Sequence, residues 1–193
     1  MAFRTLAPTL LLAAPRLRDP NFERTVVLLG KHEKDGALGW VLNGASLHPV
    51  GDLLRAAELL PPEGKLPDTQ AFRRRAQVGG PVHPESGWLL YRTKSASFPG
   101  EVVMGRLAVC NRPEALQAVI QGQPPHDFRL FLGYAGWGPG QLEAEMKEGV
   151  WFPGPFDADL IFESNGASLW EEAFERATGL PPSHFTQTEW GRA

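Results

Sequence analysis

The strongest pattern for chemistry is a glycine-rich segment that runs from Gly133 to Glu145 and holds four glycines. It follows an apolar run, and its glycines and proline predict a sharp turn from a strand into a helix. In this interpretation Gly138 is the N-cap and Pro139 stands in the first helical position. The backbone N–H groups of Gly140 and Gln141 would then face outward at the positive helix end, which suits an anion or a carboxylate.

Two acids of the same predicted helix are candidate acid–base groups. Glu143 and Glu145 stand two residues apart, so they point in different directions and do not form a carboxylate pair. We expect Glu143 to have a structural role, either in an ion pair with Arg24 or another basic group, or as an acceptor for backbone N–H groups. We expect Glu145 to contribute little. On spacing alone, we favour a segment whose glycines serve the turn and whose Trp137 fills the core.

Other patterns for catalysis each fail at a single residue. His32 lacks the second histidine of a zinc protease helix, because Gly36 stands at that position. Ser46 and Ser168 each lack the second glycine of a nucleophile elbow. The glycine-rich segment also lacks the Lys and Ser/Thr that complete a phosphate-binding loop. The sequence therefore predicts no catalytic residue, no metal site and no cofactor.

Composition is typical of an ordinary globular domain. The chain has 193 residues, of which 42% are hydrophobic and 21% charged, and a formal net charge of −3. The single cysteine, Cys110, has no partner for an internal disulfide, which favours the cytoplasm. The apolar run at 6–14 imitates a signal peptide, but Pro8 and Thr9 interrupt it, and we expect a buried strand over 9–14 instead. No run approaches the roughly 18 apolar residues of a membrane span, so no membrane association is expected.

Short apolar runs alternate with amphipathic stretches along the whole chain. An Asp35-Gly36 turn between two β-rich runs predicts a hairpin. Strands are expected at 9–14, 26–29, 38–42, 78–82, 88–91, 107–110 and 130–132, helices at 50–60, 113–120, 139–148 and 169–177, and a surface connection at 61–75. This mixture indicates one α/β domain, on the border of α+β, with a mixed sheet flanked by helices.

Four stretches, at 19–26, 36–43, 79–82 and 133–145, together resemble the signatures of the YqgE/AlgH family of bacterial proteins, in the family's order. The resemblance covers roughly 10–179. It implies a compact cytoplasmic α/β domain over 1–180 with a partly barrel-like sheet, followed by a C-terminal tail over 181–193. The family's biochemical activity is uncharacterised. Its usual label, transcriptional regulator, rests on a link to the control of alginate synthesis.

These stretches supply a candidate binding pocket. Asp19 predicts an Asx-type turn, Arg24 precedes a strand where it can reach a carboxylate, and Asn43 ends a strand where it can cap a turn or contact a ligand. The Gly79-Gly80-Pro81 turn exposes backbone N–H groups and can face the glycine-rich segment across a cleft. The candidate pocket comprises Arg24, Asn43, Gly79, Gly80, Pro81, Tyr134, Gly136, Trp137, Gly138, Gly140, Gln141 and Glu143.

Two functions of different classes fit these residues. The first, which we favour, is a non-enzymatic regulatory or binding protein whose partner is an unknown protein or a small anionic ligand. The second is an enzyme on a small anionic substrate held at the glycine-rich turn, with Arg24 as clamp and Glu143 or Glu145 as acid–base group. The acidic balance argues against direct nucleic-acid binding, and Arg73–Arg75 is the only basic run. If the turn is constrained, Gly138→Val disrupts the fold and Gly44→Ala is tolerated.

Overall fold

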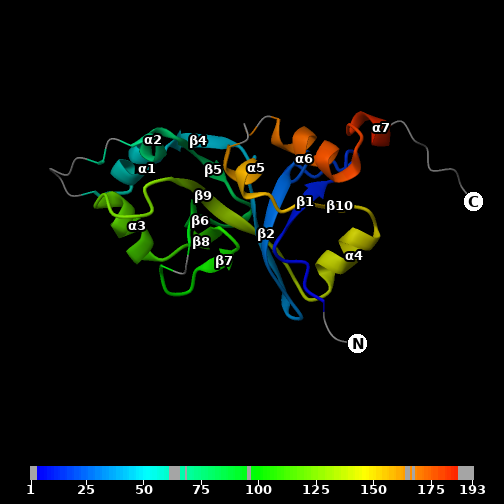
Figure 1. Ribbon diagram of the computed structural model, residues 1–193, viewed down its shortest axis with the longest axis horizontal. Helices are drawn as coiled ribbons and strands as arrows, with labels where there is room; N and C mark the ends of the chain where they lie inside the picture. The colour runs from blue at the N-terminus through cyan, green and yellow to red at the C-terminus, as the bar shows by residue number, and fades with distance from the viewer. Residues whose placement is uncertain are drawn as a thin grey trace, which may run out of the picture. The chain divides into compact units, whose positions relative to one another are not determined.

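The computed structural model describes residues 4–60, 66–67, 69–94, 97–163, 166 and 168–186. Within those residues it contains ten strands and seven helices (Figure 1). The chain divides into two compact units, one formed by Met1–Asn43 with Ala135–Ala193 and the other by Gly44–Tyr134. Strand β9 (Phe128–Trp137) contributes residues to both units.

The first unit is an antiparallel sheet with helices on both faces. Its strands, in the order β10-β1-β2-β3-β9, are β10 (Trp151–Gly154), β1 (Thr9–Ala13), β2 (Val26–Glu33), β3 (Gly36–Val41) and the end of β9. Strand β1 and the β2–β3 hairpin confirm the prediction. The helices are α4 (Gln141–Lys147), α5 (Ala158–Glu163), α6 (Leu169–Thr178) and α7 (Ser183–Thr186).

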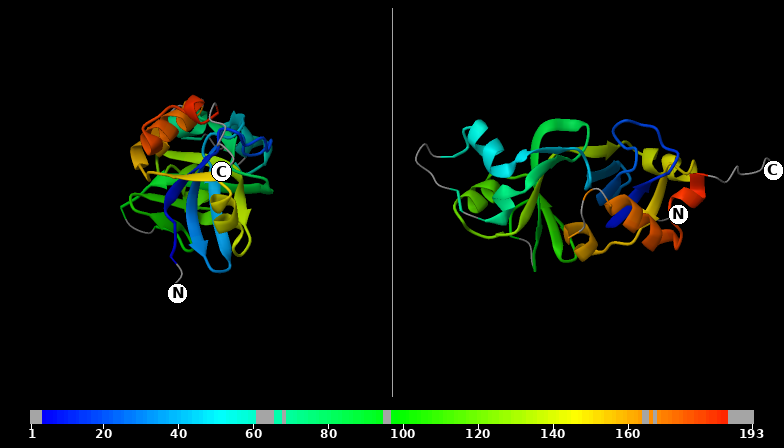
Figure 2. Two further views of the ribbon diagram at one scale, coloured as in Figure 1. Left: turned by 90° about the vertical axis from the view of Figure 1, so that its right-hand side faces the viewer. Right: turned by 90° about the horizontal axis from the view of Figure 1, so that it is seen from above.

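Alternation along the strands shows which helix covers which face. Leu11 and Trp151 share a core cluster with Leu142 of α4. Phe152, the next residue of β10, turns to the opposite face and packs its ring against Phe174 of α6, with centroids 5.5 Å apart. Helix α6 also contacts β1 and β2, beside which it lies in Figure 2. Residues of β1 are therefore buried on both faces, which explains their continuous apolar run.

The second unit holds the only parallel pair of strands in the described part of the chain. Its order is β4 (Ser46–Pro49), β5 (Arg75–Val78), the start of β9, β6 (Val82–Arg92), β8 (Leu107–Cys110) and β7 (Val102–Met104), with β5 parallel to β9. The helices are α1 (Val50–Ala56), α2 (Gln70–Arg73) and α3 (Pro113–Ile120). The mixed α/β fold is thus confirmed. The strand order does not return to its start, so among the described residues the sheet is not closed into a barrel.

Several predicted boundaries were wrong. Helix α1 ends at Ala56 and not at residue 60, and Glu58 just beyond it has a left-handed backbone with φ +55°. Helix α2 lies inside the predicted surface connection, of which 61–65 and 68 lie outside the described residues. The strand predicted at 78–82 is two strands, because the Gly79-Gly80-Pro81 turn separates β5 from β6. Five short elements, β4, β7, β10, α5 and α7, were missed, because each carries too few residues to show a period.

The glycine-rich segment also differs from the prediction. It stays in strand β9 as far as Trp137, where Gly136 pairs with Leu38 of β3. Helix α4 begins only at Gln141, after a left-handed Gly140 with φ +72°, so Gly138 is not the N-cap. The N–H of Gln141 donates to the carbonyl of Gly138 at 3.1 Å, and the Gln141 side chain accepts from the N–H of Gly138 at 3.0 Å. At least these two N–H groups are therefore not available to an anion.

No helix in the described ranges is long and apolar enough to cross a membrane.

Candidate functional site

The turn that precedes β2 places Arg24. Asp19 accepts a hydrogen bond from the N–H of Asn21 at 2.8 Å, which confirms the predicted Asx-type turn. The ring of Phe22 packs edge-on against Trp151, with centroids 5.5 Å apart, and anchors the turn to the core. The chain then enters β2 through Arg24, whose backbone is left-handed with φ +55°. Residues with a β-carbon rarely adopt this conformation. Where neighbouring groups enforce it, it points to a functional site.

Asn43, at the end of the β2–β3 hairpin, supplies that enforcement. Its side-chain amide donates to the carbonyl of Arg24 at 2.9 Å, and its side-chain oxygen accepts from the N–H of Val26 at 2.8 Å. Asn43 therefore caps the turn, one of the two roles predicted for it. Two stretches that are distant in sequence thus converge on one strained arginine.

The guanidinium of Arg24 lies over the indole ring of Trp170, with 5.4 Å between the Cζ atom and the ring centroid. Trp170 is buried, and its Nε1–H donates to the carbonyl of Ala13 at 2.9 Å, so the ring is fixed in place. The sequence had predicted a carboxylate partner for Arg24. Arg24 instead contacts an aromatic ring, and this cation–π contact leaves its N–H groups able to donate hydrogen bonds.

A cavity of about 320 Å³ opens beside this arginine. Eight residues line it: Pro15, Arg24, Trp170, Glu171, Glu175, Pro181, Pro182 and Ser183. All belong to the first unit, and we call this cavity the Arg24 pocket. Arg24 was predicted from the sequence, but the other lining residues were not. Helix α6 showed only the period of a packed helix, residues from 181 onward were assigned to a tail, and Pro15 stood out only as the end of a strand.

Helices α6 and α7, which contribute residues to the Arg24 pocket, are held by ring packing and by one charged contact. The ring of Phe185 in α7 lies 5.2 Å from that of Phe174, which ties the first residues of the predicted tail to α6. The carboxylate of Asp157 accepts hydrogen bonds from the backbone N–H groups of Leu160 and Asp159 and from the guanidinium of Arg176. These bonds lower the pKa of its carboxyl, and the two backbone bonds have the largest effect. Helix α6 is thereby linked to the start of α5.

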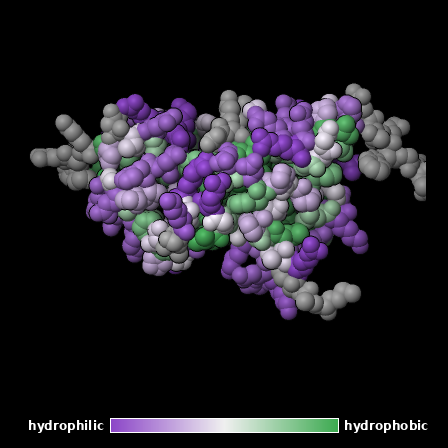
Figure 3. Space-filling model, viewed as in Figure 1, coloured by the Kyte–Doolittle hydropathy of each residue, from purple (hydrophilic) through white to green (hydrophobic). Residues whose placement is uncertain are grey.

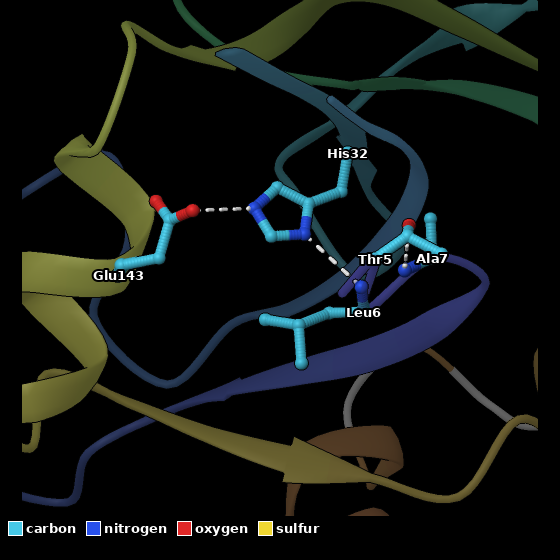
Figure 4. A network of polar contacts seen from close by, with 5 residues as sticks. All are labelled: Thr5, Leu6, Ala7, His32 and Glu143. Carbon is cyan, nitrogen blue, oxygen red and sulfur yellow. Dashed lines mark hydrogen bonds and ion pairs between the residues drawn. The ribbon is translucent and has the colours of Figure 1, made fainter. Parts of the chain in front are cut away.

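Glu143 pairs with a buried histidine and not with Arg24. Its carboxylate lies 3.1 Å from Nε2 of His32, whose Nδ1 accepts from the N–H of Leu6 at 3.0 Å (Figure 4). Because Nδ1 is an acceptor, Nε2 carries the hydrogen and donates it to Glu143. The expected structural role with another basic group is therefore what the geometry shows. The pair joins α4, β2 and the residues that precede β1.

Glu145 has more partners than Glu143, contrary to expectation. One carboxylate oxygen accepts from the indole N–H groups of Trp137 and Trp151, at 2.9 and 2.8 Å, and the other accepts from the side chain of Gln141 at 2.8 Å. Both indoles are buried. The predicted core role of Trp137 is confirmed, and Glu145 is the hydrogen-bond acceptor for its buried indole N–H. Among the residues with described positions, no cluster of three or more His, Cys, Asp or Glu side chains could hold a metal ion.

The remaining predicted pocket residues belong to the second unit. Gly79 approaches Gly133 so closely that a Cβ on Gly79 would lie 2.5 Å from the carbonyl oxygen of Gly133. Gly80 and Pro81 complete the turn that begins at Gly79. The ring of Tyr134 stacks on His83 with centroids 6.0 Å apart. The candidate residues therefore divide between the two units, and the cleft between the two glycine turns stays a prediction.

Removal of the Asn43 amide gives a direct test of the Arg24 arrangement. We expect Asn43→Ala to lower the free energy of unfolding by about 2 kcal/mol, because it leaves the N–H of Val26 without its acceptor and releases the Arg24 carbonyl. Urea unfolding measures the loss. Asn21→Ala, which keeps the backbone N–H that bonds to Asp19, is the matched control, and an equal loss in both variants would contradict this role for Asn43.

Comparisons with known proteins identify relatives over nearly the whole length. Residues 10–182 match the family model described as AlgH-like. A UPF0301 protein of Anaeromyxobacter dehalogenans is 40% identical over 93% of this chain and 91% of its own length, and one from Methylococcus capsulatus is 39% identical over 87% of both chains. The solution structure of the AlgH protein from Pseudomonas aeruginosa superimposes with a TM-score of 0.73 at 29% identity, covering 100% of both chains. The resemblance seen in the four sequence stretches is thus confirmed, and the chain belongs to the AlgH-like family.

Proposed function

We propose that this protein is a non-enzymatic binding protein that recognises a ligand in the Arg24 pocket and acts as a regulator through the bound state. One observation carries the proposal. An arginine in a strained backbone conformation, fixed by Asn43 and in cation–π contact with a buried tryptophan, forms part of the wall of a cavity of about 320 Å³. Such strain persists only where the surrounding structure enforces it, and it gathers at ligand sites. The ligand accordingly carries an anionic group for Arg24.

The state of the acidic groups in the glycine-rich segment supports binding over catalysis. The carboxylate of Glu143 accepts from His32, and that of Glu145 accepts from two buried indoles. His32 has both ring nitrogens in hydrogen bonds and is buried. A general acid or base must reach its substrate and exchange a proton with it, and these groups are instead engaged in hydrogen bonds within the protein.

Regulation in the cytoplasm completes the proposal. The regulatory part rests on membership of the AlgH-like family together with the label that the family carries. The cytoplasmic part rests on Cys110, a buried free thiol whose pKa is raised by burial, so that it is a poor nucleophile and gives no sign of an oxidising compartment. The partner that reads the bound state is an unknown protein.

A thermal-stability screen of the full chain against a library of small metabolites tests this function. We expect at least one compound that raises the melting temperature of the wild type and of Arg18→Met, but not of Arg24→Met. Arg18 is the control because it is an exposed arginine paired with Glu23, outside the pocket. In parallel, the wild type is assayed for turnover of phosphoesters, esters and nucleotides. Turnover that is lost in a stably folded Glu143→Gln variant would overturn the non-enzymatic proposal.

We expect any DNA binding by the isolated protein to be weak and strongly dependent on salt. The net charge is −3, and affinity for the phosphate backbone requires clustered Lys and Arg. Fluorescence anisotropy with random and promoter-derived duplexes, at low and at physiological salt, measures this. Sequence-specific binding that persists at physiological salt would contradict the expectation.

A further inference from the structure

We propose that the Arg24 pocket binds a zwitterionic α-amino acid with an apolar side chain. This inference rests on the proposed function and names the class of its ligand. The structure brings together one guanidinium, two carboxylates and an apolar wall around a single cavity. Each of these three features selects a different part of the ligand.

The guanidinium selects a carboxylate. The Cζ atom of Arg24 lies 5.4 Å from the ring centroid of Trp170, and this cation–π contact uses none of the N–H donors of the guanidinium. The edge of the guanidinium matches the two oxygens of a planar carboxylate in a bidentate pair. Three of the eight lining residues are prolines, which have no backbone N–H, and Arg24 is the one lining residue with a cationic side chain, so Arg24 is the group that pairs with an anion.

The two carboxylates select a cation and disfavour a phosphate. Glu171 and Glu175 stand four residues apart on α6, so they share one face of the helix, and both line the pocket. With one arginine, the charged side chains of the pocket sum to −1. A phosphate dianion would meet this excess of negative charge, whereas the ammonium of an amino acid matches it.

The wall and the size select an apolar side chain on a small molecule. Trp170, Pro15 and Pro182, which have apolar rings, are buried residues that line the cavity. A volume of about 320 Å³ lies at the lower end of the range of roughly 300–1,000 Å³ for ligand pockets. The surface over α6 and α7 in Figure 3 mixes hydrophilic residues with a few hydrophobic ones, as suits a small charged ligand better than a broad apolar partner.

Isothermal titration calorimetry on the full chain tests the ligand class. The probes are L-leucine and L-phenylalanine, the analogue of each that lacks the amino group, the analogue of each that lacks the carboxylate, and inorganic phosphate. We expect an amino acid to bind at least tenfold more tightly than either of its analogues and than phosphate.

Variants assign each charge to its partner. Arg24→Met should weaken binding of the amino acid at least tenfold. Arg24→Lys keeps the charge but loses the planar guanidinium, so it should weaken binding less. The double variant Glu171→Gln/Glu175→Gln should weaken binding of the amino acid. Its affinity for the analogue without the amino group should stay the same or rise. Glu148→Gln, an exposed glutamate that follows α4 outside the pocket, is the control and should change nothing.

The outcomes separate the inference from the proposed function. Phosphate or a deaminated analogue that binds as tightly as the amino acid, and is lost in Arg24→Met, overturns the zwitterion class and leaves the pocket as a ligand site. Failure of every probe also overturns the class, and the metabolite screen then decides the proposed function on its own. Amino-acid binding that is unchanged in folded Arg24→Met overturns the assignment to this pocket.

Discussion

Glu145→Ala should be among the most destabilising single substitutions in the first unit. It removes the acceptor from the indole N–H groups of Trp137 and Trp151, which are only 7% and 3% exposed. A buried donor left without a partner costs about 1–3 kcal/mol, so we expect the free energy of unfolding to fall by about 3 kcal/mol. Urea unfolding followed by tryptophan fluorescence measures the loss and reports on the same two rings.

The control for Glu145 is its neighbour Glu143, which the sequence had ranked as the more important of the two. Glu143→Gln keeps a side-chain oxygen that can still accept from His32, so we expect a loss of about 1 kcal/mol or less. Glu145→Gln, which also keeps one oxygen, should fall between wild type and Glu145→Ala. If Glu145→Ala unfolds at the same urea concentration as wild type, the two indoles do not depend on this carboxylate.

Elements marked by local signals were predicted well. The Asp35-Gly36 dipeptide marks the β2–β3 hairpin: Asp35 lies in the turn, and Gly36 begins β3 with φ +141°, an angle that glycine adopts readily. Pro113 stands at the start of α3, and α6 ends at a left-handed Gly179. In each case the information lies within a few neighbouring residues, which is why spacing was sufficient.

The glycine-rich segment could not be assigned by the same reasoning. Glycine serves a turn or a close approach of backbones equally well, and a single sequence does not tell which. In the structure Gly136 continues the ladder of β9, and the turn is confined to the residues before Gln141. The predicted N-cap was therefore wrong although a helix does follow.

The candidate site was predicted only where one residue carried its own signal. Arg24 and Asn43 lie in stretches that stood out, and the structure joins them by a hydrogen bond. Trp170 and Pro182 complete the pocket from the other end of the chain, where they read as an ordinary helix residue and a helix stop. The pocket forms only when α6 packs against the sheet and brings these distant segments together. The residue pattern within any one segment therefore does not predict it.

Gly133 is the glycine whose substitution should most disturb the second unit. Its φ is +73°, and a Cβ there would lie 2.3 Å from the carbonyl oxygen of Gly80, within the turn that links β5 to β6. The unusual backbone adds strain of about 1–3 kcal/mol. The clash with rigid backbone adds about as much again. We therefore expect Gly133→Ala to lower the free energy of unfolding by about 3 kcal/mol or more, measured by urea unfolding.

The matched control is Gly138→Ala, which reverses the expectation drawn from sequence. A Cβ on Gly138 would meet nothing closer than the Gln141 side-chain oxygen at 3.8 Å, so its stability should stay within about 0.5 kcal/mol of wild type. Gly138→Val should likewise leave the fold intact. If Gly138→Ala proves as costly as Gly133→Ala, the constraint lies in the turn before α4 and not in the approach of Gly133 to Gly80. The four glycines of this segment then differ in role: at Gly133 the missing side chain permits backbone contact, whereas at Gly140 glycine permits the left-handed conformation that begins α4.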